Sequence, residues 1–319
     1  MLDAIAIGEL LIDFTVDRLQ DDGYPVMAAH PGGSVANFLA PLAKFGKKTA
    51  LVSKVGNDAL GRQLVETIKA GNIDATNVNV TDDAFTTLAF VTRDANGERE
   101  FSFARKPGAD TLLSLEDINM DLLSQTKVLH FGTVCMTQEP ARSTHYKVVE
   151  TAKAAGAMIT FDPNLREPLW ADLEDCKAQM EWGFRRADVV KISDNEVEFL
   201  FDTTPEEGAK ILREKFGVKL VFVTLGRDGC HFANQHATGT VPGHTDITPV
   251  DTTGAGDIFG GTATWGILET GKKPEDLTFD QLKAIADRAC VTASLSTENL
   301  GGISGVPEMD AIEAVLKTR

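Results

Sequence analysis

The residues best suited to chemistry lie in one short run, Asp251-Thr252-Thr253-Gly254-Ala255-Gly256-Asp257, which an apolar helix-like pattern follows at once. Small residues at such a junction let backbone N–H groups approach a ligand without interference from a Cβ atom. The first turn of a helix leaves those N–H groups unpaired and carries partial positive charge, so it attracts an anion. Asp257 would then stand beside the anion and take a proton from a hydroxyl group, as phosphoryl transfer to an alcohol requires. The run also fits a simpler interpretation, in which Asp257 only complements the dipole of an N-capped helix.

Charge and composition narrow the classes of partner. The chain has 319 residues and a formal net charge of −16, which argues against nucleic acid or an anionic membrane as a partner. The same charge repels a phosphate donor, so we expect a local device to bind it: a helix N-terminus, a few arginines and Mg²⁺. There is no membrane-length apolar run and no basic signal-peptide start, so we expect a cytoplasmic protein. The four cysteines lack metal-ligand spacing and are expected to be buried free thiols.

Short apolar runs alternate with helix-like periods along most of the chain. The strand-like segments are 4–7, 10–16, 49–55, 128–131, 158–161, 189–192 and 220–224. The helix-like segments are 35–45, 60–70 and 144–155, and a Pro-, Gly- and His-containing segment covers 23–33. Strands separated by helices of this length build a mostly parallel sheet with right-handed crossovers. The pattern therefore predicts an α/β fold.

One stretch interrupts this alternation. Segments 86–92 and 99–103 are strand-like, and Asp94-Ala95-Asn96-Gly97 between them is a strong signal for a hairpin turn. Because hairpins do not belong inside a parallel sheet, we expect this one to project and to form a small antiparallel flap with residues 16–31. A sheet that small seldom buries both faces, so it should cover a ligand or pair with a second copy of the chain.

Five sequence fragments, one of which is the run 251–257, occur in order along residues 8–307. They are Gly32-Gly33-Ser34-Val35-Ala36-Asn37 with its continuation to Gly61, residues 162–166, 195–198, 224–229 and the run 251–257. Together they resemble the ribokinase-like sugar kinases, also called the phosphofructokinase B family. Within that family the likeness is closest to fructokinases, through residues 8–14, 97–101, 162–170 and 191–193. The resemblance implies one three-layer α/β/α catalytic domain over 1–319, with a small antiparallel lid at about 16–31 and 84–105.

The resemblance also implies an ATP-dependent sugar kinase and assigns its chemistry. Asp257 would be the base that activates a sugar hydroxyl, and an ordinary aspartate pKa near 4 would keep it ionised at neutral pH. Backbone N–H groups of Gly254, Ala255 and Gly256 would hold the charge that develops on the transferring phosphoryl group. Arg166 would be directed to phosphate or substrate, a task that suits a guanidinium better than an ammonium.

Sugar-binding and nucleotide-binding positions follow from the same resemblance. Asp13, interpreted as ending a first strand at the carboxyl edge of the sheet, would bind sugar hydroxyls. The other sugar-binding candidates are Gly32, Gly33, Asn37, Asp257, Phe101, Phe103, Arg105 and Glu139. Phe101 and Phe103 would either close the flap over the sugar or form its hydrophobic core. The candidates for the nucleotide are Asn164, Lys191, Asn195, Thr224, Gly226, Gly229, Gly254, Gly256 and Asn299.

The resemblance also implies candidate sites for Mg²⁺ and K⁺. Glu198, on one helix face with Asn195, would hold Mg²⁺ through water. Asp251 and Thr253 match positions that bind K⁺ in many relatives. Lys191 is equally consistent with a nucleotide contact and with an ordinary ion pair.

The resemblance thus favours an ATP- and Mg²⁺-dependent fructokinase that could form a homodimer through the lid. Alternatives to this interpretation stay open at this point. One is a kinase of the same family that acts on 2-keto-3-deoxygluconate, ribose or a nucleoside. Another is a non-catalytic sugar- or nucleotide-sensing relative, although such proteins tend to lose the base or the glycine-rich cradle, and both are present here. A dinucleotide oxidoreductase would need Gly-x-Gly-x-x-Gly after the first strand, which Gly8-Glu9-Leu10-Leu11 does not supply.

Overall fold

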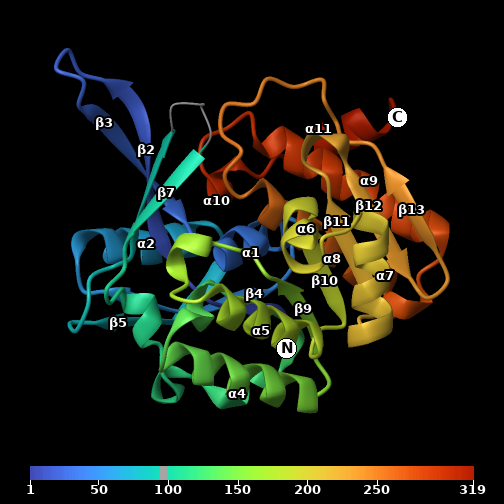
Figure 1. Ribbon diagram of the computed structural model, residues 1–319, viewed down its shortest axis with the longest axis horizontal. Coiled ribbons are helices and arrows are strands. Elements are labelled where there is room, and N and C mark those ends of the chain that lie inside the picture. Colours follow the sequence, from blue (N-terminus) through green and yellow to red (C-terminus); the bar gives the residue numbers. More distant parts are fainter. Residues whose placement is uncertain (94–98) are drawn as a thin grey trace.

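The centre of the molecule is a large, mostly parallel sheet, as predicted (Figure 1). The computed structural model describes residues 1–93 and 99–319, so the predicted turn at 94–97 lies outside the described residues. The sheet has the strand order β13-β12-β11-β10-β9-β8-β1-β4-β5, in which β12 pairs antiparallel with both β11 and β13 and the other neighbouring pairs of described strands are parallel. The strands are β1 Leu2–Ile7, β4 Thr49–Gly56, β5 Ile73–Thr81, β8 Thr126–Gly132, β9 Met158–Asp162, β10 Val189–Ser193, β11 Leu220–Thr224, β12 Cys230–Asn234 and β13 Thr238–Val241.

Helices cover both faces of this sheet, which gives the three-layer arrangement. Both faces of the sheet need cover because side chains alternate across a strand. In β1, Ile5 and Ile7 belong to one hydrophobic core, and Ala4 and Ala6 belong to the core on the other face. One face carries α3 Met120–Leu123, α4 Ala141–Ala154, α5 Leu173–Phe184, α6 Asp194–Phe201 and α7 Pro205–Phe216. The opposite face carries α1 Ser34–Lys44, α2 Ala59–Ala70, α8 Ala255–Thr270 and α9 Phe279–Ser296, and α10 Gly302–Gly305 and α11 Met309–Leu316 follow. None of the helices in the described parts of the chain is both long and apolar enough to cross a membrane.

A second, four-stranded sheet stands off from the body of the molecule (Figure 1, upper left). Its order is β3-β2-β6-β7, with β2 Leu11–Leu19, β3 Pro25–Gly32, β6 Leu88–Arg93 and β7 Arg99–Ala104. Both hairpins are antiparallel, as predicted for the flap, and one parallel pair between β2 and β6 joins them. Segment 23–33 is therefore mostly a strand, and its two prolines are tolerated because β3 lies at the edge of the sheet.

The β6–β7 hairpin is anchored at its base by a buried ion pair. Arg105, directly after β7, donates through Nε to Asp110 Oδ2 at 2.9 Å, and the two side chains are only 4% and 0% exposed. Asp110 also accepts a hydrogen bond from Thr87, the residue before β6. Burial alone would raise the pKa of Asp110, but the Arg105 guanidinium outweighs it and holds the pKa below its usual value. One carboxylate thus holds both ends of the hairpin.

We expect Asp110→Asn to lower the free energy of unfolding by about 3 kcal/mol, because it leaves the Arg105 charge buried without a partner. Urea denaturation measures the change. The matched control is Glu66→Gln, which breaks the Lys69–Glu66 pair on α2, whose side chains are 56% and 71% exposed. That control should change the unfolding free energy by less than about 0.5 kcal/mol. Equal effects of the two variants would contradict the role assigned to burial.

Candidate active site

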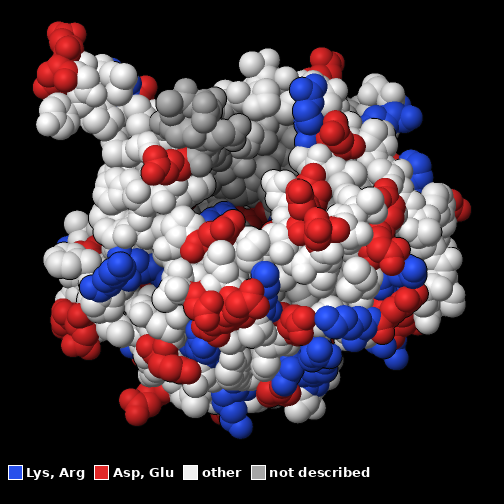
Figure 2. Space-filling view, in the orientation of Figure 1, with Lys and Arg blue, Asp and Glu red and all other residues white. Residues whose placement is uncertain are grey.

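A cavity of about 1560 Å³ lies along the carboxyl ends of the central strands. Figure 2 shows this face hollowed between the small sheet and the C-terminal helices. Residues that follow β1, β8 and β9 line the floor, together with the ends of β10 and β11. One end of the cavity is bounded by β2 and β7 of the small sheet, and the other by residues of α9 and the loop after β13. Ligands of open parallel sheets normally bind at this edge.

Most of the residues predicted from the sequence come together in this cavity. Its lining includes Asp13, Gly33, Asn37, Phe101, Phe103, Asn164, Arg166, Lys191, Asn195, Thr224, Gly226, Gly229, Thr253, Gly254, Ala255, Gly256 and Asp257. Asp13 reaches the cavity by a route that differs from the expected one. It lies within β2, opposite His30 of β3, whereas β1 ends at Ile7. Its carboxylate therefore comes from the small sheet and not from the edge of the large one.

Some predicted residues do not line the cavity. Arg105 is held by Asp110 instead of facing a ligand, and it also donates to the Val134 carbonyl at 2.9 Å. Glu139 is exposed and accepts from the Ser143 backbone N–H at 3.1 Å. These two side chains are therefore not positioned to contact a sugar in this structure.

Glu198, Asn299, Asp251 and Gly32 also lie outside the lining. Glu198 is exposed and does not line the cavity, although Asn195 and Phe199 of the same helix do. Asn299 is exposed. Asp251 is buried and accepts from the backbone N–H groups of Thr253 at 2.9 Å and Gly301 at 3.1 Å. Gly32 leaves room for the Asp13 carboxylate, since a Cβ atom at position 32 would overlap it.

Helix α8 begins at the predicted place and presents open donors. Its N-cap, Gly254, has φ +77° and no side-chain cap, as expected where a chain turns left-handed before a helix. The Ala255 N–H donates weakly to the Thr252 carbonyl at 3.4 Å. The N–H groups of Gly254, Gly256 and Asp257 have no acceptor among the described residues. This helix N-terminus therefore keeps the donors that an anion requires.

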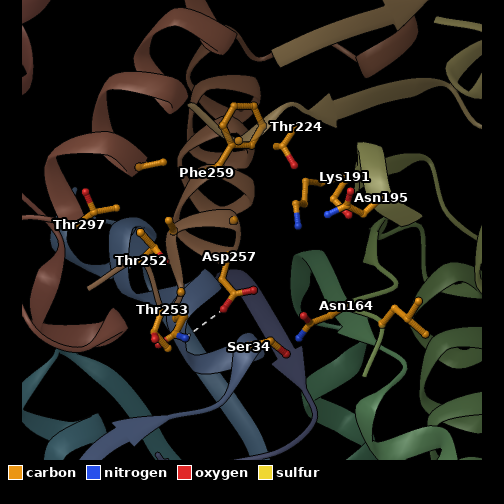
Figure 3. A pocket seen from close by; sticks show the side chains of 18 of the residues that line it. Ser34, Asn164, Lys191, Asn195, Thr224, Thr252, Thr253, Asp257, Phe259 and Thr297 are labelled. Atoms are coloured by element: carbon orange, nitrogen blue, oxygen red, sulfur yellow. Dashed lines mark hydrogen bonds between the residues drawn. The ribbon is translucent and has the colours of Figure 1, made fainter. Parts of the chain in front are cut away.

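Asp257 lies in the middle of the cavity, where Figure 3 shows it between Ser34 and Lys191. Its Oδ2 accepts from Asn37 Nδ2 at 3.0 Å. Asn37 Oδ1 is buried and has no partner among the described residues, although buried polar atoms are normally hydrogen-bonded. This oxygen is packed against Gly302, where a Cβ atom would lie 2.3 Å from it, so Asn37 turns its amide N–H toward the Asp257 carboxylate.

The pKa of Asp257 differs from the ordinary value near 4 that was expected from the sequence. Burial raises the pKa of Asp257 to about 7, the Asp162 carboxylate acts in the same direction, and the Lys191 ammonium opposes both. Lys191 Nζ pairs with Asp162 Oδ2 at 2.9 Å and also lines the cavity. A Cβ atom at position 256 would be 3.0 Å from Lys191 Nζ, so the glycine lets this ammonium approach the start of α8.

Two buried glutamates were not assigned a role from the sequence. Glu9 lines the cavity, and its Oε1 accepts from the Ser34 N–H at 2.7 Å and the Ser34 Oγ at 2.6 Å. It thereby caps α1, whose N-cap residue Gly33 has no side chain to do so. Glu196 forms a capping box with Ser193 and accepts from the Leu165 N–H at 2.7 Å. The available signal was a glutamate within three residues of the end of an apolar strand.

Comparisons with known proteins agree with this geometry. A family model described as pfkB family carbohydrate kinase matches residues 1–309. Fructokinase-2 of Solanum lycopersicum is 38% identical over 317 residues, which cover 98% of this chain and 95% of the relative. The structure of a fructokinase from Xylella fastidiosa with bound ATP superimposes with a TM-score of 0.90 at 25% identity, covering 100% of this chain and 99% of that one.

A second solved structure is similar over the same length. Fructokinase from Vibrio cholerae O395 in a fructose-, ADP- and calcium-bound form has a TM-score of 0.87 and 29% identity, covering 98% of each chain. A double mutant of that protein in a fructose-, ADP- and potassium-bound form has a TM-score of 0.86 at the same identity and coverage. The family match over nearly the whole length and the fructokinase relatives together show that this chain belongs to the pfkB family of carbohydrate kinases.

Proposed function

We propose that this chain is a fructokinase, which transfers the terminal phosphoryl group of ATP to D-fructose and forms fructose 6-phosphate. The observation that carries the proposal is the position of Asp257, which lines the cavity, is held by the Asn37 amide and stands at the open N-terminus of α8. Residues 1–319 would act as one catalytic unit, with the four strands of the small sheet as a lid. The similar solved fructokinases, with ATP in one case and fructose and ADP in the other, support this pairing of ligands.

The charges beside the small sheet favour a neutral sugar. The carboxyl groups of Asp13, Glu100 and the buried Glu9 line this end of the cavity, where they outnumber the Arg166 guanidinium that lies over the small sheet. Arg105 was a sugar-binding candidate in the sequence, but its positive charge is balanced by the Asp110 carboxylate. Hydroxyl groups can donate to carboxylates, whereas the carboxylate of 2-keto-3-deoxygluconate would be repelled by them. The site therefore favours fructose over the sugar acid.

In the proposed reaction Asp257 accepts the proton of the sugar hydroxyl while Asn37 orients the carboxylate. The N–H groups of Gly256 and Asp257 and the guanidinium of Arg166 stabilise the charge on the phosphoryl group in transit. A divalent cation bound with ATP would neutralise phosphate charge, and the first turn of α6, with Asp194 and Asn195 in the cavity lining, would hold its water ligands. We propose Mg²⁺ in this role.

We also propose a monovalent cation site and a homodimer. The loop that carries Asp251 and Thr253 lies next to the start of α8 and would bind K⁺, in keeping with the potassium-bound form of the Vibrio relative. The edge strands of the small sheet, β3 and β7, would pair with a second copy of the chain in a homodimer, because edge strands leave backbone groups without partners.

The test of the proposed function is steady-state kinetics with ATP and Mg²⁺ and with fructose, 2-keto-3-deoxygluconate or ribose as the acceptor. We expect kcat/KM to be highest for fructose, with the phosphate on its terminal hydroxyl. A preference for the sugar acid would refute the charge argument for the acceptor. Absence of turnover with every acceptor would favour the non-catalytic alternative.

Asp257→Asn should lower kcat by at least ~10²-fold, because it removes the proton acceptor. The KM for the sugar should change much less, since an amide oxygen can still accept from Asn37. Stopped assays at high enzyme concentration measure the residual rate. Near-normal turnover would exclude Asp257 as the base.

The raised pKa of Asp257 predicts that kcat/KM falls about tenfold per pH unit below about pH 7, because the base must be deprotonated. ATP itself titrates near this range, so the sharper test compares variants. Asp162→Asn removes the carboxylate that raises the pKa of Asp257, and it should move the acid limb to lower pH. An acid limb that stays in place in this variant would contradict the assignment.

A further inference from the structure

The guanidinium of Arg166 lies over an aromatic ring of the small sheet. Arg166 reaches the cavity from the loop after β9, and its Cζ is 5.4 Å from the centroid of the Phe101 ring on β7. Within the described residues it forms no ion pair with a carboxylate, and its hydrogen bond is from Nη1 to the Leu165 carbonyl at 2.9 Å. The ring is thus the side-chain contact of this cation within the described residues, beside its hydrogen bond to the Leu165 carbonyl.

The backbone below Arg166 is fixed independently of the ring. Asn164 has φ +48°, and its N–H donates to Asp162 Oδ1 at 3.1 Å. The Leu165 N–H donates to Glu196 Oε1 at 2.7 Å. These bonds hold the loop, but they leave the long Arg166 side chain free to choose among its rotamers. An aromatic ring below the guanidinium favours those rotamers that keep the cation over it.

The ring is itself held in place from the other side. Phe101 stacks on Phe103 along the same face of β7, with ring centroids 6.2 Å apart, and both line the cavity. The strand ends at the buried Arg105–Asp110 pair, which fixes its position relative to the body. Of these two rings, Phe101 is the one that lies over a cation within the described residues.

We propose that Phe101 is a positioning residue for phosphoryl transfer: it holds the Arg166 guanidinium in the orientation that meets the transferring group. The small sheet thereby contributes to the transfer step itself, in addition to covering the sugar. This inference rests on the proposed kinase function, and specifically on Arg166 acting at the phosphoryl group.

The first experiment compares Phe101→Leu, Phe101→Tyr and Phe90→Leu. We expect Phe101→Leu to lower kcat by about threefold to tenfold, as the loss of one cation–π contact implies, with less than about twofold change in the KM for ATP. Phe101→Tyr keeps the ring and should restore kcat to within about twofold of the wild type. Phe90→Leu removes a ring that packs on Phe14 in the same sheet outside the cavity lining, so it should leave kcat unchanged. Equal losses in the Leu and Tyr variants at position 101 would overturn the proposal.

A double-mutant cycle with Arg166→Gln gives the decisive test. In the Arg166→Gln background, Phe101→Leu should cost less than about twofold in kcat, because the cation that it positions is gone. Fully multiplicative losses would refute the coupling. The thermal midpoint of each variant shows whether it folds, and Phe101→Met replaces Phe101→Leu if the latter does not.

The cycle is run with whichever acceptor the wild type phosphorylates. A wrong sugar assignment would therefore appear in the acceptor panel and leave the cycle interpretable. Conversely, multiplicative losses with an active wild type would refute the role of Phe101 alone.

Discussion

The close packing of α8 on α1 is the constraint on which the site depends. A Cβ atom at position 261 would lie 2.0 Å from the Phe38 carbonyl oxygen, so α8 can approach α1 only with glycine there. That approach brings Asn37, on α1, within hydrogen-bonding distance of Asp257 at the start of α8. It also directs the open end of α8 into the cavity instead of into solvent. The absence of a side chain at Gly261 thus sets the positions of Asp257 and of the open α8 amides relative to Asn37.

Anion binding by a chain of net charge −16 depends on where the charges are placed. Lys191, which is half-buried, pairs with the buried Asp162, and Arg166 lies over an aromatic ring, so both cations remain within the cavity instead of pairing with surface carboxylates. The α8 N-terminus adds partial positive charge without any ionised group. The surplus of carboxylates near the small sheet is compatible with this arrangement because hydroxyl groups can satisfy them.

The sequence was sufficient for those features that are encoded locally. The parallel sheet followed from the alternation of apolar runs and helical periods, and the start of α8 followed from the small residues at 254–256. Features that depend on distant contacts were not predictable in this way. The raised pKa of Asp257 requires a carboxylate that is 95 positions away in the chain, and the buried position of Arg105 involves the Val134 carbonyl, 29 positions away. Glu198 lies outside the lining although Asn195 and Phe199 of the same helix line the cavity, because motif spacing does not show which face of the helix meets the cavity.

Glu9 has a consequence for how such an enzyme can change its substrate. The same carboxylate forms part of the sugar end of the cavity and terminates the hydrogen bonding of α1, a helix buried along most of its length. A substitution that altered recognition at this position would also weaken the helix on which α8 rests. Evolution toward a new acceptor is therefore easier through the outer strands, where residues can vary without cost to the core.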